Sequence, residues 1–392
     1  PASFAADPPA SLAEKRVLTA EGYDDSVISP AVRAWRRDLT EKNYGAIPLI
    51  SKKEIFDYFF RFDAHGALRL EDTIYLSRGA SDPFYFRPPA IVHAALETAA
   101  EKNWFGYSDS LGHSETRKAI VRLERYRRHQ GRLNADQVAV MQGGISGLNA
   151  VLSLLARDRP GTSCLMASPN YAPIIDATAH YFTPRLIELN SDYTLSTETL
   201  LAAAQDGTVS VILLSVPHNP SGQVDIRPML DELHTICVSQ NSYIIIDEIS
   251  FDKGTSPLLD PVKYPRLIVI SSYSKNYKIP GLKLGHMLAS PEFISRFYRH
   301  ASTTYGSPPS YLYLTCSALA EAELAYLSRQ PATLPPPMQE ISIYTKEIAQ
   351  EFELWQALCD LMDQFRQHAL ESALRRNNCE DRVRLFGIED AS

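Results

Sequence analysis

Lys275, a lysine among small hydroxyl residues, has the surroundings in this sequence that most suggest covalent chemistry. Apolar runs lie on either side of it at 267–270 and 284–289, and a break at Pro280 and Gly281 precedes the second run. We expect Lys275 on a turn just past a strand end, held by rigid backbone on both sides. A lysine that is partly desolvated or near other cations can lose its proton and form a Schiff base. A surface lysine in a polar loop is the alternative, and this segment alone does not decide.

Two turns upstream of the lysine could hold an anion and a planar ring. Gly144, Ile145 and Ser146 follow an expected strand and open a helix, where backbone N–H groups and the serine hydroxyl can bind phosphate. The pattern lacks the lysine of a P-loop and the spacing of a dinucleotide-binding loop, so a glycine helix cap is an equal alternative. Tyr171 follows the next strand and a proline, where its ring could stack on a cofactor or simply fill a loop.

Two further strands are followed by an amide and a carboxylate. Asn219 lies between Pro217 and Pro220, which fix the backbone, and its amide can donate to a phenolate oxygen. Asp247 ends the apolar run 244–246, so we expect it at the sheet edge and partly buried. A buried carboxylate needs a cationic or donor partner, which a protonated pyridine nitrogen or a nearby arginine or lysine could supply.

These groups together match the needs of pyridoxal 5′-phosphate. Phosphate donors, a stacking ring, an amide, a carboxylate and a lysine each follow a successive expected strand. The cofactor needs its phosphate anchored, its ring stacked, its O3′ hydrogen-bonded, its ring nitrogen charge-paired and its aldehyde bound to a lysine. With Asp247 keeping the ring nitrogen protonated, the ring can accept the electrons released when a bond to the substrate Cα breaks. We therefore predict pyridoxal 5′-phosphate as the cofactor.

Alternating apolar runs and helical stretches predict the elements that carry these side chains. Strands that are apolar throughout, with helices between several of them, indicate an α/β fold with a mainly parallel seven-stranded sheet covered on both faces. Ligands bind such sheets beyond the carboxyl ends of the strands. The expected strands are 137–141, 163–167, 185–189, 209–216, 243–247, 267–271 and 284–289, with helices such as 146–156 and 228–239 between them.

The domain organisation follows from the ends of this pattern. We expect residues 1–70 to form an N-terminal extension and part of a small domain, residues 71–310 a large cofactor-binding domain, and residues 311–392 a mostly helical remainder of the small domain. The helix expected from about 114 to 128 carries a basic face, which we interpret as solvated. Other expected elements are helices at 29–62, 311–327 and 340–376 and short strands at 74–77 and 382–388.

Composition narrows the possible partners. The 392 residues carry a formal net charge of −7, which argues against nucleic acid because phosphate binding needs a basic face. No apolar run approaches the roughly 20 residues that span a bilayer, so we expect no membrane segment. The five dispersed cysteines indicate reduced thiols in a cytoplasmic protein, without a disulfide framework or a metal site. The first residues also lack the pattern of a signal peptide.

Between about residues 74 and 319 the chain resembles the class I/II aminotransferase family, the fold-type I pyridoxal-phosphate enzymes. The resemblance implies a three-layer sandwich with a smaller second domain. The residues that carry it are Gly79, Tyr107 before Gly112, Gly144–Ile145–Ser146, Tyr171, Asn219, Asp247, Ser272, Ser274, Lys275 and Pro280–Gly281–Leu282.

This resemblance implies a role for each matching residue. Lys275 would be the Schiff-base lysine and proton shuttle, Asn219 would bind O3′, and Asp247 would pair with the pyridine nitrogen. Ser146 and Ser272 would hold the phosphate.

The resemblance also implies partners. Family members are usually homodimers with the site at the subunit interface, so Tyr107 would reach the phosphate of the partner subunit, and Gly79 would lie on the substrate side. The substrate would be an amino acid, with a 2-oxo acid as the second substrate of a transamination.

Three positions depart from the family. Lys283 stands where the family has a phosphate-binding arginine, which keeps the charge but loses the bidentate fork. Ser250 stands where the family usually has a tyrosine that bonds O3′. The tail after residue 330 is short and helical, and Arg384, or alternatively Arg382, is the candidate for binding the substrate carboxylate. These departures suggest a specialised member.

The leading functional hypothesis is transamination, in which the substrate amine displaces Lys275 and the lysine then moves a proton between the substrate Cα and the cofactor. A lyase, a β- or γ-replacement enzyme, a cyclisation enzyme or a decarboxylase of specialised metabolism would share the early steps, so it stays as the alternative. A non-enzymatic ligand sensor on the same fold is the third hypothesis. The first 70 residues lack the basic recognition helix that such a sensor usually carries.

Overall fold

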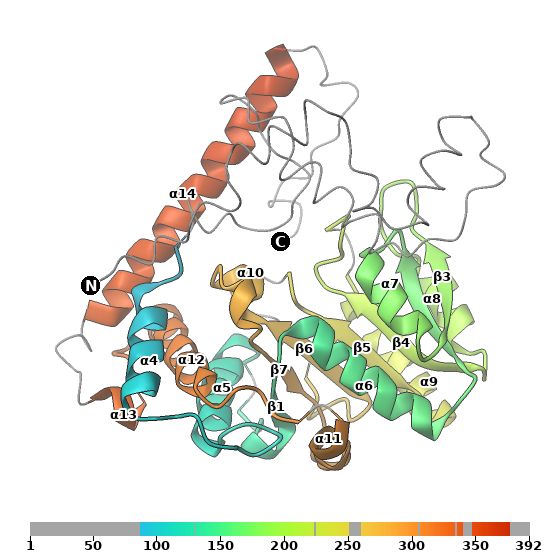
Figure 1. The fold of residues 1–392 in the computed structure, drawn as a ribbon. Coiled ribbons are helices and arrows are strands. Elements are labelled where there is room, and N and C mark those ends of the chain that lie inside the picture. Colours follow the sequence, from blue (N-terminus) through green and yellow to red (C-terminus); the bar gives the residue numbers. More distant parts are fainter. Residues whose placement is uncertain are drawn as a thin grey trace, which may run out of the picture. The chain divides into compact units, whose positions relative to one another are not determined.

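The centre of the structure is a seven-stranded sheet in the order β1-β7-β6-β5-β4-β2-β3 (Figure 1). The computed structural model describes residues 87–129, 131–222, 225–250, 260–304, 306–333, 335–339 and 347–376, all within the compact unit Ala80–Ser392. The strands are β1 (Val138–Met141), β2 (Ser163–Ser168), β3 (Thr183–Glu188), β4 (Val209–Ser215), β5 (Tyr243–Asp247), β6 (Leu267–Ser272) and β7 (Gly285–Leu288).

Strand pairing confirms the α/β fold with a mainly parallel sheet. The pairs β2–β3, β2–β4, β4–β5 and β5–β6 are parallel. Only β7 runs against its neighbours in this sheet, pairing antiparallel with β1 and with β6. The carboxyl ends of β6, β5, β4 and β2 therefore meet along one edge of the sheet, which is where an α/β sheet binds its ligands.

Helices cover both faces of the sheet, as the expected three-layer sandwich requires. Helices α6, α7 and α11 pack on one face, and α4, α5, α8, α9 and α12 pack on the other (Figure 1). The helices are α4 (Ala90–Glu101), α5 (Ser114–Arg127), α6 (Gly144–Asp158), α7 (Ala172–Ala179), α8 (Thr197–Ala204), α9 (Leu230–Gln240), α10 (Tyr273–Asn276), α11 (Pro291–Thr304), α12 (Leu312–Ser328), α13 (Pro336–Gln339) and α14 (Glu347–Arg376).

Side-chain alternation explains why the strands are apolar throughout. In β5, Ile244 and Ile246 belong to the core cluster on the α5 and α12 face, whereas Ile245 belongs to the cluster on the α6 face. Successive side chains of a strand point to opposite faces, so a strand covered on both faces needs apolar residues at every position. The edge strand β3 contains Pro184 and Arg185, which are tolerated because one side of it is unpaired.

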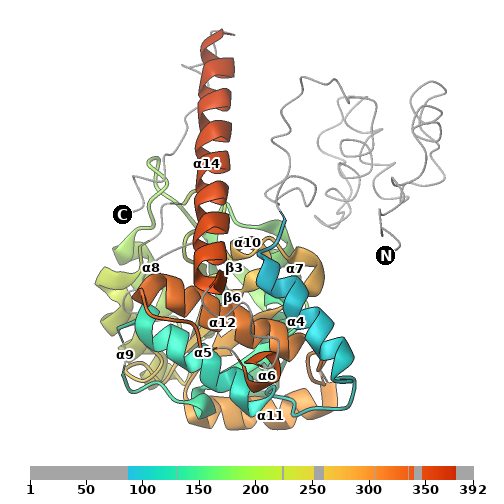
Figure 2. The ribbon, with the colours of Figure 1, turned by 90° about the vertical axis from the view of Figure 1, so that its left-hand side faces the viewer.

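The C-terminal part of the described chain continues as helices. Helix α12 packs against α4, α5 and α14, and Figure 2 shows α12 lying between α4 and α5. Phe352, Trp355 and Cys359 bury one face of α14 in the core cluster on the α5 and α12 side. The expected helix at 340–376 is described from residue 347 onward.

Several predictions lie outside the described residues. These are the helix at 29–62, the strands at 74–77 and 382–388, and the residues Gly79, Arg382 and Arg384. Of the helices in the described part, none is long and apolar enough to cross a membrane. The same residues contain no cluster of three metal-ligating side chains. Their four cysteines are buried.

Candidate active site

Lys275 lies on a single helical turn, α10, directly after β6. Ser272 caps this turn, because its hydroxyl accepts a hydrogen bond from the Ser274 N–H at 3.3 Å. Burial lowers the pKa of Lys275 from its usual value, and the positive charges of Lys278 and Lys283 lower it further. These are the two physical causes that make a lysine amine available for covalent chemistry near neutral pH.

The glycine turn before α6 lies against the lysine segment. Gly143 caps α6 with a φ of 76°, and a Cβ on it would be 3.5 Å from the Lys283 Cα. A Cβ on Gly144 would be 3.7 Å from the Ser272 Cβ. The first N–H groups of α6, the Ser272 hydroxyl and Lys283 therefore come from three segments that meet in space.

The other two residues of this turn differ in exposure. Ile145 is 37% exposed, and Ser146 is half-buried in the first turn of α6. The hydroxyl of Ser146 thus belongs to the same helix end as the unpaired backbone donors.

Asp247 ends β5 and is more deeply buried than the sequence led us to expect, with 7% of its surface exposed. Its carboxylate accepts hydrogen bonds from the Ile249 N–H at 2.9 Å and from the Ser215 hydroxyl at 3.3 Å. Burial raises the pKa of Asp247 to about 6. Among the described residues no lysine or arginine forms an ion pair with Asp247, so a cation brought by a ligand would stabilise its charged form.

Asn219 and Tyr171 follow neighbouring parallel strands. Asn219 comes after β4 and is exposed, while Tyr171 comes after β2, caps α7 and is 43% exposed. Next to Asn219, the buried His218 shares a hydrogen bond of 2.9 Å with Ser221. Asn219, Tyr171, Asp247 and Lys275 thus follow four adjacent parallel strands.

Tyr107 and Ser250 are the remaining predicted site residues that the structure describes. Tyr107 is fully exposed in the segment between α4 and α5. Ser250 is exposed two residues beyond Glu248. Both side chains are therefore accessible from solvent in the described unit.

A set of buried charged residues was not foreseen from the sequence. The end of the basic helix at 114–128 was expected to be solvated, but Arg127 and Arg128 are only 5% and 7% exposed. Arg128 pairs with Glu248 at 2.6 Å, and Arg127 pairs with Glu323 of α12. The correction has a simple cause, because acidic residues far along the chain bring counter-charges to this helix end. In the sequence, only the carboxylate of Glu248, directly after Asp247, indicated that a buried cation could lie nearby.

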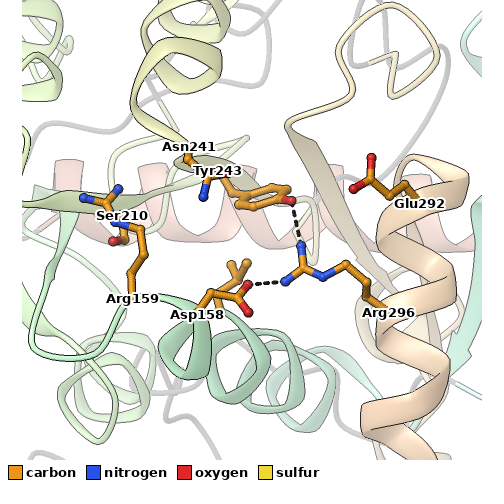
Figure 3. A pocket seen from close by; sticks show the side chains of 8 residues that line it. Asp158, Arg159, Ser210, Asn241, Tyr243, Glu292 and Arg296 are labelled. Carbon is orange, nitrogen blue, oxygen red and sulfur yellow. Dashed lines mark hydrogen bonds and ion pairs between the residues drawn. The ribbon is translucent and has the colours of Figure 1, made fainter.

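A separate hollow of about 390 Å³ lies at the opposite edge of the sheet, beside the amino ends of β4 and β5 (Figure 3). Arg296 donates to the Tyr243 hydroxyl at 3.0 Å and to Asp158. Arg159 donates to the carbonyl oxygens of Gln240 and Gly207. Both guanidinium groups thus already donate hydrogen bonds to protein groups, and none of the predicted site residues lines this hollow.

Curated relatives of this chain are aminotransferases. An arginine–pyruvate transaminase of Pseudomonas aeruginosa is 29% identical over 267 residues, which are 66% of this chain and 66% of the relative. An aspartate aminotransferase of Thermotoga maritima is 27% identical over 257 residues, 62% of this chain and 65% of the relative. The chain thus spans slightly less than two thirds of the length of these two relatives.

Solved structures share the fold at low identity. The aspartate aminotransferase of Thermotoga maritima superposes with a TM-score of 0.58 at 22% identity, covering 75% of this chain and 76% of that one. The aspartate aminotransferase of Thermus thermophilus with maleate superposes with a TM-score of 0.56 at 18% identity, covering 77% and 73%. These structures support the aspartate-aminotransferase-like fold.

The family model described as aminotransferase class I and II matches residues 72–353. This region contains the lysine turn, the buried aspartate and the glycine turn described above, and it makes up most of the chain. The chain therefore belongs to the class I and II aminotransferase family, with the fold-type I architecture.

Proposed function

We propose that this protein is a pyridoxal-phosphate-dependent aminotransferase that acts through Lys275. The observation that carries the proposal is the lowered pKa of Lys275, caused by burial and by Lys278 and Lys283. This lysine follows β6, which is paired with the strand that ends in the buried Asp247. A lysine with these causes of activation, next to a buried carboxylate at a sheet edge, fits an aldehyde cofactor with a basic ring nitrogen.

The described residues fit the phosphate of this cofactor. The N-terminus of α6, the Ser272 hydroxyl and Lys283 would hold it, since Gly143 and Gly144 let these segments approach closely. Ser146 adds a hydroxyl at the same helix end. Lys283 would act as a point charge, where an arginine would bind through two parallel hydrogen bonds.

The ring would be held by residues that follow β2, β4 and β5. Tyr171 would stack on it, Asn219 would donate to its phenolate oxygen, and Asp247 would pair with its protonated nitrogen. Ser250 is an additional candidate donor to the same oxygen. The pKa of Asp247, raised by burial to about 6, would fall when this cation neutralises it.

Lys275 would carry the proton chemistry. When bound, the cofactor supplies an electron sink for bonds to the substrate Cα. The Lys275 Nζ would hold the proton removed from the substrate Cα and return it to the product. Its lowered pKa suits this task, because burial and the neighbouring lysine charges favour the neutral amine, which is the form that accepts a proton.

The substrates are proposed by class only. The named relatives act on arginine with pyruvate and on aspartate, so an amino acid and a 2-oxo acid are the proposed substrates here. Gly79 and Arg384, or Arg382 in its place, remain proposed substrate-side residues.

A homodimer is proposed because the fully exposed Tyr107 would reach a partner subunit's phosphate. A cytoplasmic location is proposed from the five scattered cysteines, whose spacing in the sequence includes no CxxC pair.

A lyase, replacement, cyclisation or decarboxylation enzyme of specialised metabolism is the second candidate. Lys283 and Ser250, which differ from the family pattern, favour it. A screen of amino acids with and without a 2-oxo acid separates the two candidates. Amino transfer that requires the 2-oxo acid supports the aminotransferase, whereas release of ammonia, CO2 or another fragment without it would identify the second candidate.

A further inference from the structure

A continuous chain of buried ion pairs lies on the face of the sheet opposite α6. Glu124 of α5 is fully buried and accepts hydrogen bonds from Arg128 at 2.8 Å and from Arg127 at 3.0 Å. Arg128 reaches on to Glu248 with bonds of 2.6 and 3.2 Å, and Arg127 reaches on to Glu323. Burial alone would raise the pKa of Glu124, but Arg128 and Arg127 hold it well below its usual value. The two arginines thus favour the charged form of Glu124 at the centre of these ion pairs.

Both ends of this chain contact elements of the proposed site. At one end, Glu323 accepts a hydrogen bond from Tyr277, two residues after Lys275. At the other end, Glu248 follows Asp247 directly and accepts a bond of 3.3 Å from Ser271, the residue before Ser272. The ion pairs thus contact the carboxyl-terminal ends of β5 and β6 on the face of the sheet that α5 and α12 cover.

Strand alternation separates the two neighbouring carboxylates. Successive side chains point to opposite faces, so Asp247 lies on the α6 face and Glu248 on the face covered by α5 and α12. Both carboxylates are more than nine-tenths buried. Their charges repel through a medium of low dielectric, unless one of them is neutralised.

We propose that Arg128 is a positioning residue for cofactor binding: by neutralising Glu248 it leaves Asp247 as the one unbalanced carboxylate at the end of β5, available to the cofactor's ring nitrogen. This inference rests on the proposed function. Arg128 lies on the opposite face of the sheet from Asp247, and two of its nitrogens bind the Glu248 carboxylate and fix it in place.

The proposal has a direct electrostatic consequence. The charge of Glu248 is one cause that raises the pKa of Asp247, after burial. Without Arg128 this charge would act more strongly, so a smaller fraction of Asp247 would be ionised at neutral pH. We expect Arg128→Gln to weaken binding of pyridoxal 5′-phosphate about tenfold or more, since one pKa unit corresponds to a factor of ten.

The test measures the dissociation constant of pyridoxal 5′-phosphate by cofactor absorbance for wild type, Arg128→Gln, Glu248→Gln and the double variant. Glu248→Gln alone should bind as tightly as wild type, and the double variant should regain most of the lost affinity, because the repelling charge is gone. The control is Arg122→Gln, which removes an arginine of α5 that pairs with Glu321 of α12, outside the chain of ion pairs that reaches Glu248.

A loss of affinity in Arg128→Gln without recovery in the double variant would show that Arg128 has only a structural role, and this would overturn the inference. Unchanged affinity in Arg128→Gln would overturn it too. If Arg128→Gln does not fold, Arg128→Lys replaces it: this variant keeps the positive charge beside Glu248, so it should bind the cofactor nearly as tightly as wild type, and a loss of about tenfold or more would overturn the inference. Failure of the wild type to bind the cofactor would instead remove the proposed function.

Discussion

At the scale of single residues, Asp247 shows most clearly that a residue of the proposed site can lower the stability of the folded protein. Its carboxylate has two hydrogen-bond donors and no ion pair within the described residues. Burial raises its pKa to about 6, which means that ionising it in the folded protein is costly. A group kept in such an environment is expected to serve a ligand, because a neutral side chain would be more stable there.

Asp247→Asn should therefore stabilise the cofactor-free protein at neutral pH. The folded carboxyl keeps its proton up to about pH 6, whereas an unfolded one loses it near 3.8, so wild type loses stability as the pH rises between these values. Above about pH 6 the cost is complete, on the order of 2–3 kcal/mol. Melting curves should show Asp247→Asn melting above wild type at pH 7 and little difference at pH 4.

The matched control is Asp231→Asn, which changes an exposed aspartate paired with Lys263. It should not reproduce the gain at pH 7. A lower melting temperature for Asp247→Asn at pH 7 would contradict a buried, uncompensated carboxylate at this position.

At the scale of elements, the site depends on close backbone approach between β6, β7 and the turn before α6. A Cβ on Gly285 would meet the Ser271 carbonyl oxygen at 2.4 Å and the Ser272 Cα at 3.4 Å. It would also lie 3.5 Å from the Gly143 carbonyl carbon. No side chain at position 285 can be accommodated without moving the strand that leads to Lys275.

Gly285→Ala should destabilise the protein by about 2–3 kcal/mol, because backbone atoms cannot move aside as side chains do. It should also weaken cofactor binding, since β6 carries Ser272. Gly281→Ala is the control: a Cβ there meets nothing within 4 Å. Chemical denaturation measures both variants, and equal stabilities would contradict the close packing of β6 on β7.

Strands and helices with strong local patterns were predictable at this scale. All seven strands were expected within two residues of their ends, because most of them are apolar runs next to a turn. Helix α11 was missed even though Phe293, Ile294, Phe297 and Ala301 bury one face of it. This spacing of apolar residues was a usable signal for an amphipathic helix.

At the scale of the whole molecule, long-range charge pairing could not be predicted. Arg128 and Glu248 are 120 residues apart, and Arg127 and Glu323 are 196 apart. A basic helix end usually indicates a solvated face, and only the fold reveals that α12 and β5 bring carboxylates to it. The same limit applies to the depth at which Asp247 is buried, which depends on the helices that cover the sheet.

Glu124→Gln should test how strongly these ion pairs hold α5, β5 and α12 together. Removing one partner of a buried ionic group leaves the others uncompensated, so we expect a loss of about 3–5 kcal/mol. Glu115→Gln is the control, because Glu115 makes an exposed pair with Lys118 on the same helix and should cost less than about 1 kcal/mol. Similar unfolding midpoints for the two variants would show that the buried pairs add little.

The central claim is that Lys275 forms the covalent bond to the cofactor. Wild-type protein would be incubated with pyridoxal 5′-phosphate, reduced with borohydride, digested and analysed by mass spectrometry. Lys278 and Lys283 lie in the same segment and serve as internal controls. The account predicts that the added pyridoxyl phosphate mass is found on Lys275 and is lost in Lys275→Ala. Labelling of another lysine in its place, or no labelling of the wild type, would contradict it.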